Sequence, residues 1–121
     1  MTPFHLAFTV SDLEATRLFF CDTLGCTMGR SAESWIDFNF FGHQITAHQI
    51  NQRDAPVHTN MVDGKEIPSN HFGVILDWDQ WHALLLRLSK ANVEFLLKPN
   101  VRFEGQIGEQ ATLILKEPSG N

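Results

Sequence analysis

The stretch Asn70-His71-Phe72-Gly73-Val74-Ile75-Leu76 decides how this chain is interpreted, because it repeats an earlier one, Phe4-His5-Leu6-Ala7-Phe8-Thr9-Val10. Each is a short apolar run with one histidine near its start. Each leads into a segment with a helix-like pattern and an acidic beginning. The two histidines lie 66 positions apart, about half of the chain. This spacing indicates an internal duplication.

Both stretches are predicted to be β-strands, in which alternate side chains share a face. In the first copy His5, Ala7 and Thr9 then point to one side. In the second copy His71 and Gly73 occupy the equivalent positions. Both copies therefore place an imidazole beside a small residue on the less apolar face, and this pairing is the main functional lead.

The composition fits one globular domain of 121 residues, with 43% hydrophobic and 19% charged residues. A formal net charge of −5 without a basic cluster argues against nucleic-acid binding. The sequence shows neither an apolar run long enough for a membrane span nor a signal-peptide pattern, so we expect a cytoplasmic protein. In that compartment Cys21 and Cys26 are expected to be reduced thiols rather than a disulfide.

The first half predicts the order strand, helix, strand, strand, strand. Ser11 followed three residues later by Glu14 predicts the start of a helix over 11–25, and Gly25 predicts its end. The three following strands are predicted at residues 26–30, 35–41 and 43–50. In the second of them Trp35, Asp37 and Asn39 share one face.

Residues 51–69 are polar and form the expected link between the copies. The second half repeats the order with a strand over 70–76 and an amphipathic helix that begins at Asp77 or Asp79. Further elements are predicted as a strand over 93–98 ended by Pro99, a loop over 102–109, a strand over 111–116 and a turn over 117–121. The first copy has one more strand after its equivalent turn, so the second copy is expected to lack its last strand in this sequence.

The chain resembles the vicinal oxygen chelate superfamily, which includes glyoxalases, extradiol dioxygenases, fosfomycin-resistance enzymes and bleomycin-binding proteins. The resemblance spans essentially all 121 residues. Its landmarks are Phe4-His5-Leu6-Ala7-Phe8, Asp12-Leu13-Glu14, Leu24-Gly25, His71-Phe72-Gly73-Val74 and Pro118-Ser119-Gly120-Asn121. Together with Gly105-Gln106-Ile107-Gly108-Glu109-Gln110, they look most similar to predicted small dioxygenases of the extradiol type.

The resemblance implies an α+β fold in which tandem βαβββ units form an open, cup-like mixed barrel. The single domain would cover residues 1–121, with a first unit at 1–50, a linker at 51–69 and an incomplete second unit at 70–121. In this superfamily a metal lies between the two halves of the cup. An open cup has exposed strand edges that need covering, so a homodimer is also expected.

The resemblance also implies the ligands. His5 and His71 match the two first-strand ligands, and His48 is either a ligand or an acid–base group. A glutamate from a further strand would lie shortly beyond Asn121. Two histidines and one carboxylate suit Fe(II), with Mn(II), Zn(II) or Ni(II) as alternatives.

Each of these residues also has a plain structural interpretation. A histidine in an apolar strand is often a core residue with its hydrogen bonds satisfied. Arg102 is either an anchor for a substrate carboxylate or a surface arginine. Asp37 either lines the pocket or is an edge charge. The histidines outside the proposed ligand set are expected to be solvated: His43, His58 and His82.

Three functions follow from this sequence. The first is a metal-dependent dioxygenase that acts on a small substrate with vicinal oxygen atoms, with His48 and Arg102 as catalytic residues. The second is a glyoxalase-like isomerase or lyase that uses the metal as a Lewis acid. The third is a non-enzymatic protein that sequesters a planar or aromatic small molecule, such as an antibiotic, in the cup through Trp35 and Phe41. The sequence contains no tyrosine, a residue that ring-cleaving extradiol enzymes commonly place beside the iron.

Overall fold

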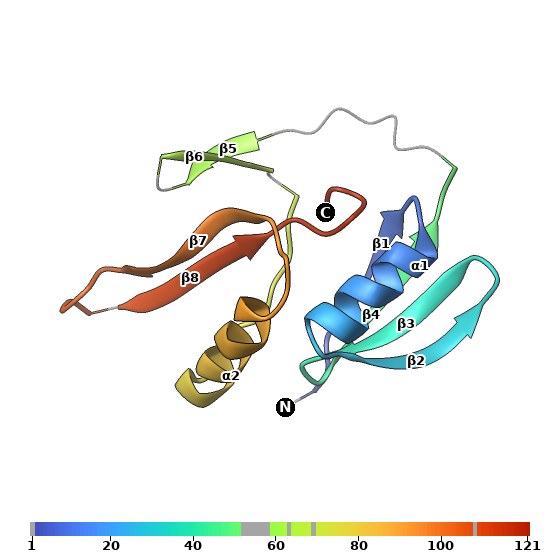
Figure 1. Ribbon diagram of the computed structural model, residues 1–121, viewed down its shortest axis with the longest axis horizontal. Helices are drawn as coiled ribbons and strands as arrows, with labels where there is room; N and C mark the ends of the chain where they lie inside the picture. Colours follow the sequence, from blue (N-terminus) through green and yellow to red (C-terminus); the bar gives the residue numbers. More distant parts are fainter. Residues whose placement is uncertain (1, 52–58, 63, 69, 108) are drawn as a thin grey trace.

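The computed structural model describes residues 2–51, 59–62, 64–68, 70–107 and 109–121 (Figure 1). Its first half contains β1 (His5–Val10), α1 (Leu13–Arg17), the π-helix η1 (Leu18–Thr23), β2 (Thr27–Ala32), β3 (Trp35–Phe40) and β4 (His43–Gln49). Its second half contains β5 (Thr59–Val62), β6 (Lys65–Pro68), α2 (Trp78–Ser89), β7 (Phe95–Arg102) and β8 (Gln110–Leu115). None of the helices in these ranges is long and apolar enough to cross a membrane.

The first half forms a four-stranded sheet with the order β1-β4-β3-β2. Strand β1 pairs with β4 in parallel, whereas β4, β3 and β2 pair antiparallel. A parallel pair needs a crossover connection, and here α1, η1, β2 and β3 lie between the two strands in sequence. The predicted order of strand, helix and three strands is thus confirmed for the first half, and so is the α+β class.

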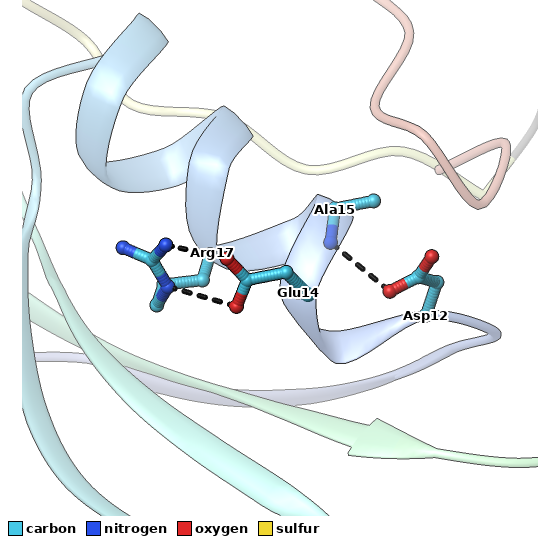
Figure 2. Close-up of polar contacts among 4 residues, drawn as sticks. All are labelled: Asp12, Glu14, Ala15 and Arg17. Atoms are coloured by element: carbon cyan, nitrogen blue, oxygen red, sulfur yellow. Dashed lines mark hydrogen bonds and ion pairs between the residues drawn. The ribbon is translucent and has the colours of Figure 1, made fainter.

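The first helical segment begins one residue later than the capping pattern predicts. Asp12 is the N-cap residue, and its Oδ1 accepts a hydrogen bond from the Ala15 N–H at 3.1 Å (Figure 2). Glu14 pairs with Arg17 instead of reaching back to the cap, with 2.6 Å between Glu14 Oε1 and Arg17 Nη2. This hydrogen bond lowers the pKa of the Glu14 carboxyl. The predicted serine cap is therefore wrong, because Asp12 is the residue whose carboxylate reaches the free N–H.

The core of the first half is built from aromatic and branched side chains on one face of the sheet. The Phe20 ring of η1 stacks on Phe38 of β3 with 5.1 Å between ring centroids, and it meets Phe8 of β1 at 5.7 Å. Ile36, Phe38 and Phe40 are buried, as their alternation in the sequence predicts. Phe38 and Phe20 are each at most 2% exposed. Burying such side chains is the main favourable term for this half.

The stretch that corresponds to β1 in the second half, residues 70–76, is not a strand of any sheet in the described part of the chain. Its apolar side chains alternate as predicted, because Phe72 and Val74 are half-buried against the first core while His71 and Gly73 are exposed. In the first half β1 is held by β4. Among the described residues of the second half, no strand follows β8 to do the same, and the stretch stays extended without a ladder.

Two further details differ from the sequence predictions. Strand β7 continues through Pro99, which was expected to end it, because the pairing with β8 shifts register between Leu97 and Asn100. A proline is tolerated at such an irregularity, where no ladder N–H is required. The predicted link over 51–69 contains the short antiparallel pair of β5 and β6.

The strands in the described part of the chain form three separate sheets of four, two and two strands, and they do not form one closed barrel. Figure 1 shows the four-stranded sheet at the right and the β7–β8 pair at the left, with α1 drawn over the sheet and α2 below the pair. Arg87 of α2 connects the halves by donating hydrogen bonds to three backbone carbonyls at the end of η1. The C-terminal turn reaches back to the first half, where Asn121 Nδ2 donates to the Thr9 carbonyl at 2.9 Å.

Candidate metal and substrate site

The face of the four-stranded sheet opposite its aromatic core presents three rows of side chains across β1, β4 and β3. Strand pairing fixes these rows, because residues aligned across neighbouring strands project to the same side. From one end of the sheet to the other the rows are His5–Gln44–Asn39, Ala7–Thr46–Asp37 and Thr9–His48–Trp35. This face contains two of the three histidines that were predicted as ligands.

His5 lies in the first row, on strand β1. Its side chain is exposed, as are those of Ala7 and Thr9, whereas Phe8 and Val10 on the other face are half-buried and buried. Its neighbour across the parallel pair is Gln44. Strand β1 therefore presents the imidazole on the polar side of the sheet, as the alternation predicts.

His71 is held by a hydrogen bond to the backbone. Its Nδ1 lies 2.7 Å from the carbonyl oxygen of Pro68. A carbonyl oxygen only accepts hydrogen bonds, so the ring nitrogen must be the donor. In the neutral ring this leaves the lone pair on Nε2 for another partner. A backbone hydrogen bond on one ring nitrogen is the usual way in which proteins orient a histidine that binds metal through the other.

His71 is also positioned by the residue that follows it. The Phe72 ring packs against Phe8 at 5.2 Å and Phe40 at 5.8 Å between centroids. In an extended chain neighbouring side chains point in opposite directions. With Phe72 against the core of the first half, His71 therefore points away from that core.

The remaining predicted site residues are His48, on β4, and Arg102, at the end of β7. His48 is exposed on β4, aligned with Thr9 and Trp35. Arg102 ends β7 opposite Gln110, but its side chain lies outside what the structure describes. His58 also lies outside the described residues. His82 is exposed on α2, and His43 is half-buried and accepts a hydrogen bond from the Phe4 N–H at 2.9 Å through Nδ1.

The described residues contain no group of three or more His, Cys, Asp or Glu side chains placed to hold a metal ion. His5 and His71 supply neutral nitrogen donors of the kind that divalent transition metals accept. The donor chemistry of the two imidazoles therefore fits such an ion. His5, however, lies on the sheet face opposite the aromatic core, whereas Phe72, the neighbour of His71, packs against that core. Ligation by these two residues and by His48 stays a prediction.

The deep burial of Asp37 is not evident from the sequence. Its side chain is in the middle row, and the residue is only 5% exposed. Thr46 Oγ1 donates to Asp37 Oδ1 at 2.6 Å, and Gln44 Nε2 donates to Oδ2 at 3.3 Å. Arg30 Nε lies 3.5 Å from the same Oδ2. The alternation of β3 places Asp37 on the face opposite its apolar residues. The contact of Asp37 with Arg30, however, depends on an irregular pairing of β2, which sequence periodicity does not reveal.

The two cysteines are free, with Cys21 half-buried and Cys26 buried. Burial raises the pKa of the Cys26 thiol to about 11, with a further contribution from Cys21. Burial likewise raises the pKa of Cys21. Both side chains are therefore neutral thiols near pH 7, which does not favour a nucleophilic role.

Comparisons with known proteins agree with this fold. The family described as the glyoxalase/bleomycin resistance protein/dioxygenase superfamily matches residues 2–121. A solved structure of a glyoxalase/bleomycin resistance protein/dioxygenase from Alicyclobacillus acidocaldarius is 30% identical with a TM-score of 0.81, over 99% of this chain and 86% of that one. A comparison with curated proteins found none that matches.

Two more distant structures share the fold. Lactoylglutathione lyase from Agrobacterium tumefaciens is 15% identical with a TM-score of 0.66, over 99% of this chain and 88% of that one. A mutant of a fosfomycin resistance protein from Listeria monocytogenes is 14% identical with a TM-score of 0.63, over 98% of this chain and 84% of that one. That protein was solved in complex with Mn(II) and 1S,2S-dihydroxypropylphosphonic acid.

Proposed function

This chain belongs to the glyoxalase/bleomycin resistance protein/dioxygenase superfamily, and we propose that it is a metal-dependent enzyme acting on a small substrate with vicinal oxygen atoms. His5 and His71 supply the two nitrogen ligands. The observation that most supports this proposal is the hydrogen bond from His71 Nδ1 to the Pro68 carbonyl, because it leaves Nε2 as the coordinating atom.

The duplicated sequence gives the second support. His5 and His71 stand at the same position of two related stretches, and both are exposed while their neighbours pack into apolar surroundings. His5 and His71 would hold a divalent ion, which would supply Lewis-acid polarisation of substrate oxygen atoms. Two adjacent substrate oxygens suit such an ion, and the fosfomycin resistance protein solved with Mn(II) and a vicinal diol has the same fold.

The chain's own residues would bind and orient this substrate. His48 lies on the same polar face as His5, two strand positions further along β4 than Thr46. As an exposed imidazole it is the proposed general acid–base group. Arg102 remains the proposed anchor on the second half for a substrate carboxylate.

The proposed reaction class is dioxygenation with Fe(II) as the ion, with Mn(II), Zn(II) or Ni(II) as alternatives. The second candidate is a glyoxalase-like isomerase or lyase. One observation favours it: the chain has no tyrosine, the residue that ring-cleaving extradiol enzymes commonly place beside the iron. Oxygen uptake during turnover separates the two classes, because an isomerase or lyase consumes no oxygen.

The structure also leaves large apolar side chains exposed in the second half, among them Ile75, Leu86 and Ile107. Strand β2 is an edge of the four-stranded sheet. Exposed edges and apolar surface are features that proteins commonly cover by association. We therefore propose a homodimer, and light scattering on the purified protein measures this directly.

The decisive experiment is the metal content of the purified full-length protein beside His5→Ala, His71→Ala and the control variant His82→Ala. His82 is exposed on α2, stacked on Trp78, and has no role in the proposal. We expect near-stoichiometric metal in the wild type and in the control, and its loss in both ligand variants. If reconstituted wild-type protein binds no metal, the ligand assignment is wrong, and a metal-independent binder of planar compounds becomes the better explanation.

A further inference from the structure

Strand β2 is interrupted where it passes Asp37. Thr27 and Met28 pair with Asn39 and Phe38, and Ser31 pairs with Ile36, so that the register shifts between Met28 and Ser31. Two residues of β2, Gly29 and Arg30, therefore stand opposite the single residue Asp37. Such a bulge changes the direction of a side chain and is common beside functional sites.

Gly29 makes this arrangement possible. A Cβ at this position would lie 3.2 Å from Asp37 Cβ, closer than ordinary van der Waals contact. Because Gly29 has no side chain, the Asp37 side chain can approach the backbone of β2 closely. The next residue, Arg30, brings its guanidinium to the carboxylate, with 3.5 Å between Nε and Oδ2.

The carboxylate and the guanidinium differ in their surroundings. The Asp37 side chain is 7% exposed and accepts hydrogen bonds from Thr46 and Gln44. The Arg30 side chain is 82% exposed. Asp37 therefore pairs with the guanidinium from its Nε side, while most of the Arg30 side chain remains exposed. An arginine presents its donors as a planar fork that matches carboxylate, phosphate and phosphonate groups.

We propose that Arg30 is an anion-binding residue, oriented by Asp37, that holds a carboxylate, phosphate or phosphonate group of the substrate. The inference rests on the proposed function, because it assigns the anionic part of the substrate to the same sheet face as His5. Arg30 belongs to β2, but its guanidinium reaches Asp37 on β3. Strand β3 is two strand spacings from β1, about 10 Å. A small molecule spans this distance with its vicinal oxygens toward His5 and its charged group toward Arg30.

The test measures anion binding in metal-free protein, after removal of metal with a chelator. Inorganic phosphate and methylphosphonate are titrated separately at low ionic strength, with binding followed by NMR of the backbone N–H groups of β2 and β3, which every variant retains. The variants are Arg30→Gln, Arg30→Lys and the control Lys90→Gln, which removes an exposed positive charge after α2. Thermal unfolding of each variant shows whether it remains folded.

We expect the wild type and Lys90→Gln to bind both anions with the same affinity. Arg30→Gln weakens binding by about tenfold or more, the effect of losing a charge-assisted hydrogen bond. Arg30→Lys keeps the charge but loses the fork, so its affinity lies between the two. Equal affinity in wild type and Arg30→Gln overturns the proposal.

The same experiment separates this inference from the proposed function. Because the titrations use metal-free protein, loss of anion binding in Arg30→Gln supports the anion site even if His5 and His71 hold no metal. Conversely, metal binding by the two histidines together with unchanged anion affinity in Arg30→Gln overturns the anion site and leaves the proposed enzyme intact.

Discussion

Thr46 donates a hydrogen bond from Oγ1 to Asp37 Oδ1 at 2.6 Å, and both residues are at most 6% exposed. They are direct partners in the antiparallel pair of β3 and β4. A carboxylate in this position needs donors, because a buried charge without them is costly. The threonine hydroxyl is thus part of what permits an acidic residue at the centre of the sheet.

We predict that Thr46→Val destabilises the protein by about 1–3 kcal/mol, since it leaves Asp37 Oδ1 without this donor at nearly unchanged side-chain shape. Thr9→Val is the matched control on the same face, where the side chain is exposed. It should change the free energy of unfolding by no more than about 0.5 kcal/mol. Urea denaturation measures both, and equal effects would contradict the role given to Thr46.

Much of the first half could be predicted from the sequence because its signals are local and consistent. Alternation in Trp35–Phe40 and His43–Gln49 identified both strands and the apolar face of each, but not the burial of Asp37 and Thr46 on the other face. Gly25 correctly marked the end of the helical segment, and its backbone φ is +82°. Alternation needs only the pleat of a strand and an apolar core, so one sequence suffices to reveal it.

The remaining features depend on contacts between distant segments. The stretch 70–76 has the alternation of a strand but no ladder among the described residues, because pairing requires a partner strand and not only a pattern. The pairing of Arg30 with Asp37 depends on a bulge, and the hydrogen bond of His71 depends on where Pro68 places its carbonyl. Whether His5 and His71 share one ion depends on how the two halves meet, which periodicity does not specify.

Arg87 and Gly25 form a second contact whose energetic role can be isolated. A Cβ on Gly25 would lie 2.9 Å from Arg87 Nε, and Arg87 is fixed by its bonds to the η1 carbonyls. Gly42 also has a positive φ, of +91°, but nothing lies within 4 Å of its Cβ position. We predict that Gly25→Ala costs more than Gly42→Ala by about 1–2 kcal/mol, because it adds the loss of Arg87 hydrogen bonds to the backbone strain.

The same comparison in the background of Arg87→Ala provides the control, again by denaturant unfolding. With the guanidinium removed, Gly25→Ala should cost no more than Gly42→Ala. If the extra cost of Gly25→Ala persists in that background, the contact with Arg87 is not its cause.

The position of the helix cap leads to a third prediction. Asp12→Ala removes the acceptor of the Ala15 N–H and should reduce stability by about 1 kcal/mol. Ser11→Ala removes only an exposed hydroxyl, 3.3 Å from Ser119 Oγ, and should cost less than about 0.5 kcal/mol. Thermal unfolding of the two variants compares them. A larger loss of stability for Ser11→Ala would show that Ser11, as the sequence pattern predicted, is the residue that caps the helix.

The last prediction concerns alkaline pH. Burial raises the pKa of Cys26 from the usual thiol value of 9.0 to about 11, so the folded state holds this proton more tightly than the unfolded chain. The associated stability is fully present below pH 9 and is lost as the pH rises toward 11, with a total of at most about 3 kcal/mol. We expect Cys26→Ala to flatten the dependence of the unfolding free energy on pH between these values.

The absence of tyrosine simplifies this measurement, because no phenol titrates in the same interval. Lysines do titrate there, but they are common to both proteins and cancel in the difference between wild type and variant. Cys21→Ala is the control. Cys21 is only half-buried, so its thiolate is less costly in the folded state and the variant should retain most of the pH dependence. A wild-type profile that matches that of Cys26→Ala from pH 8 to about pH 11 would show that the Cys26 thiolate is not excluded from the core.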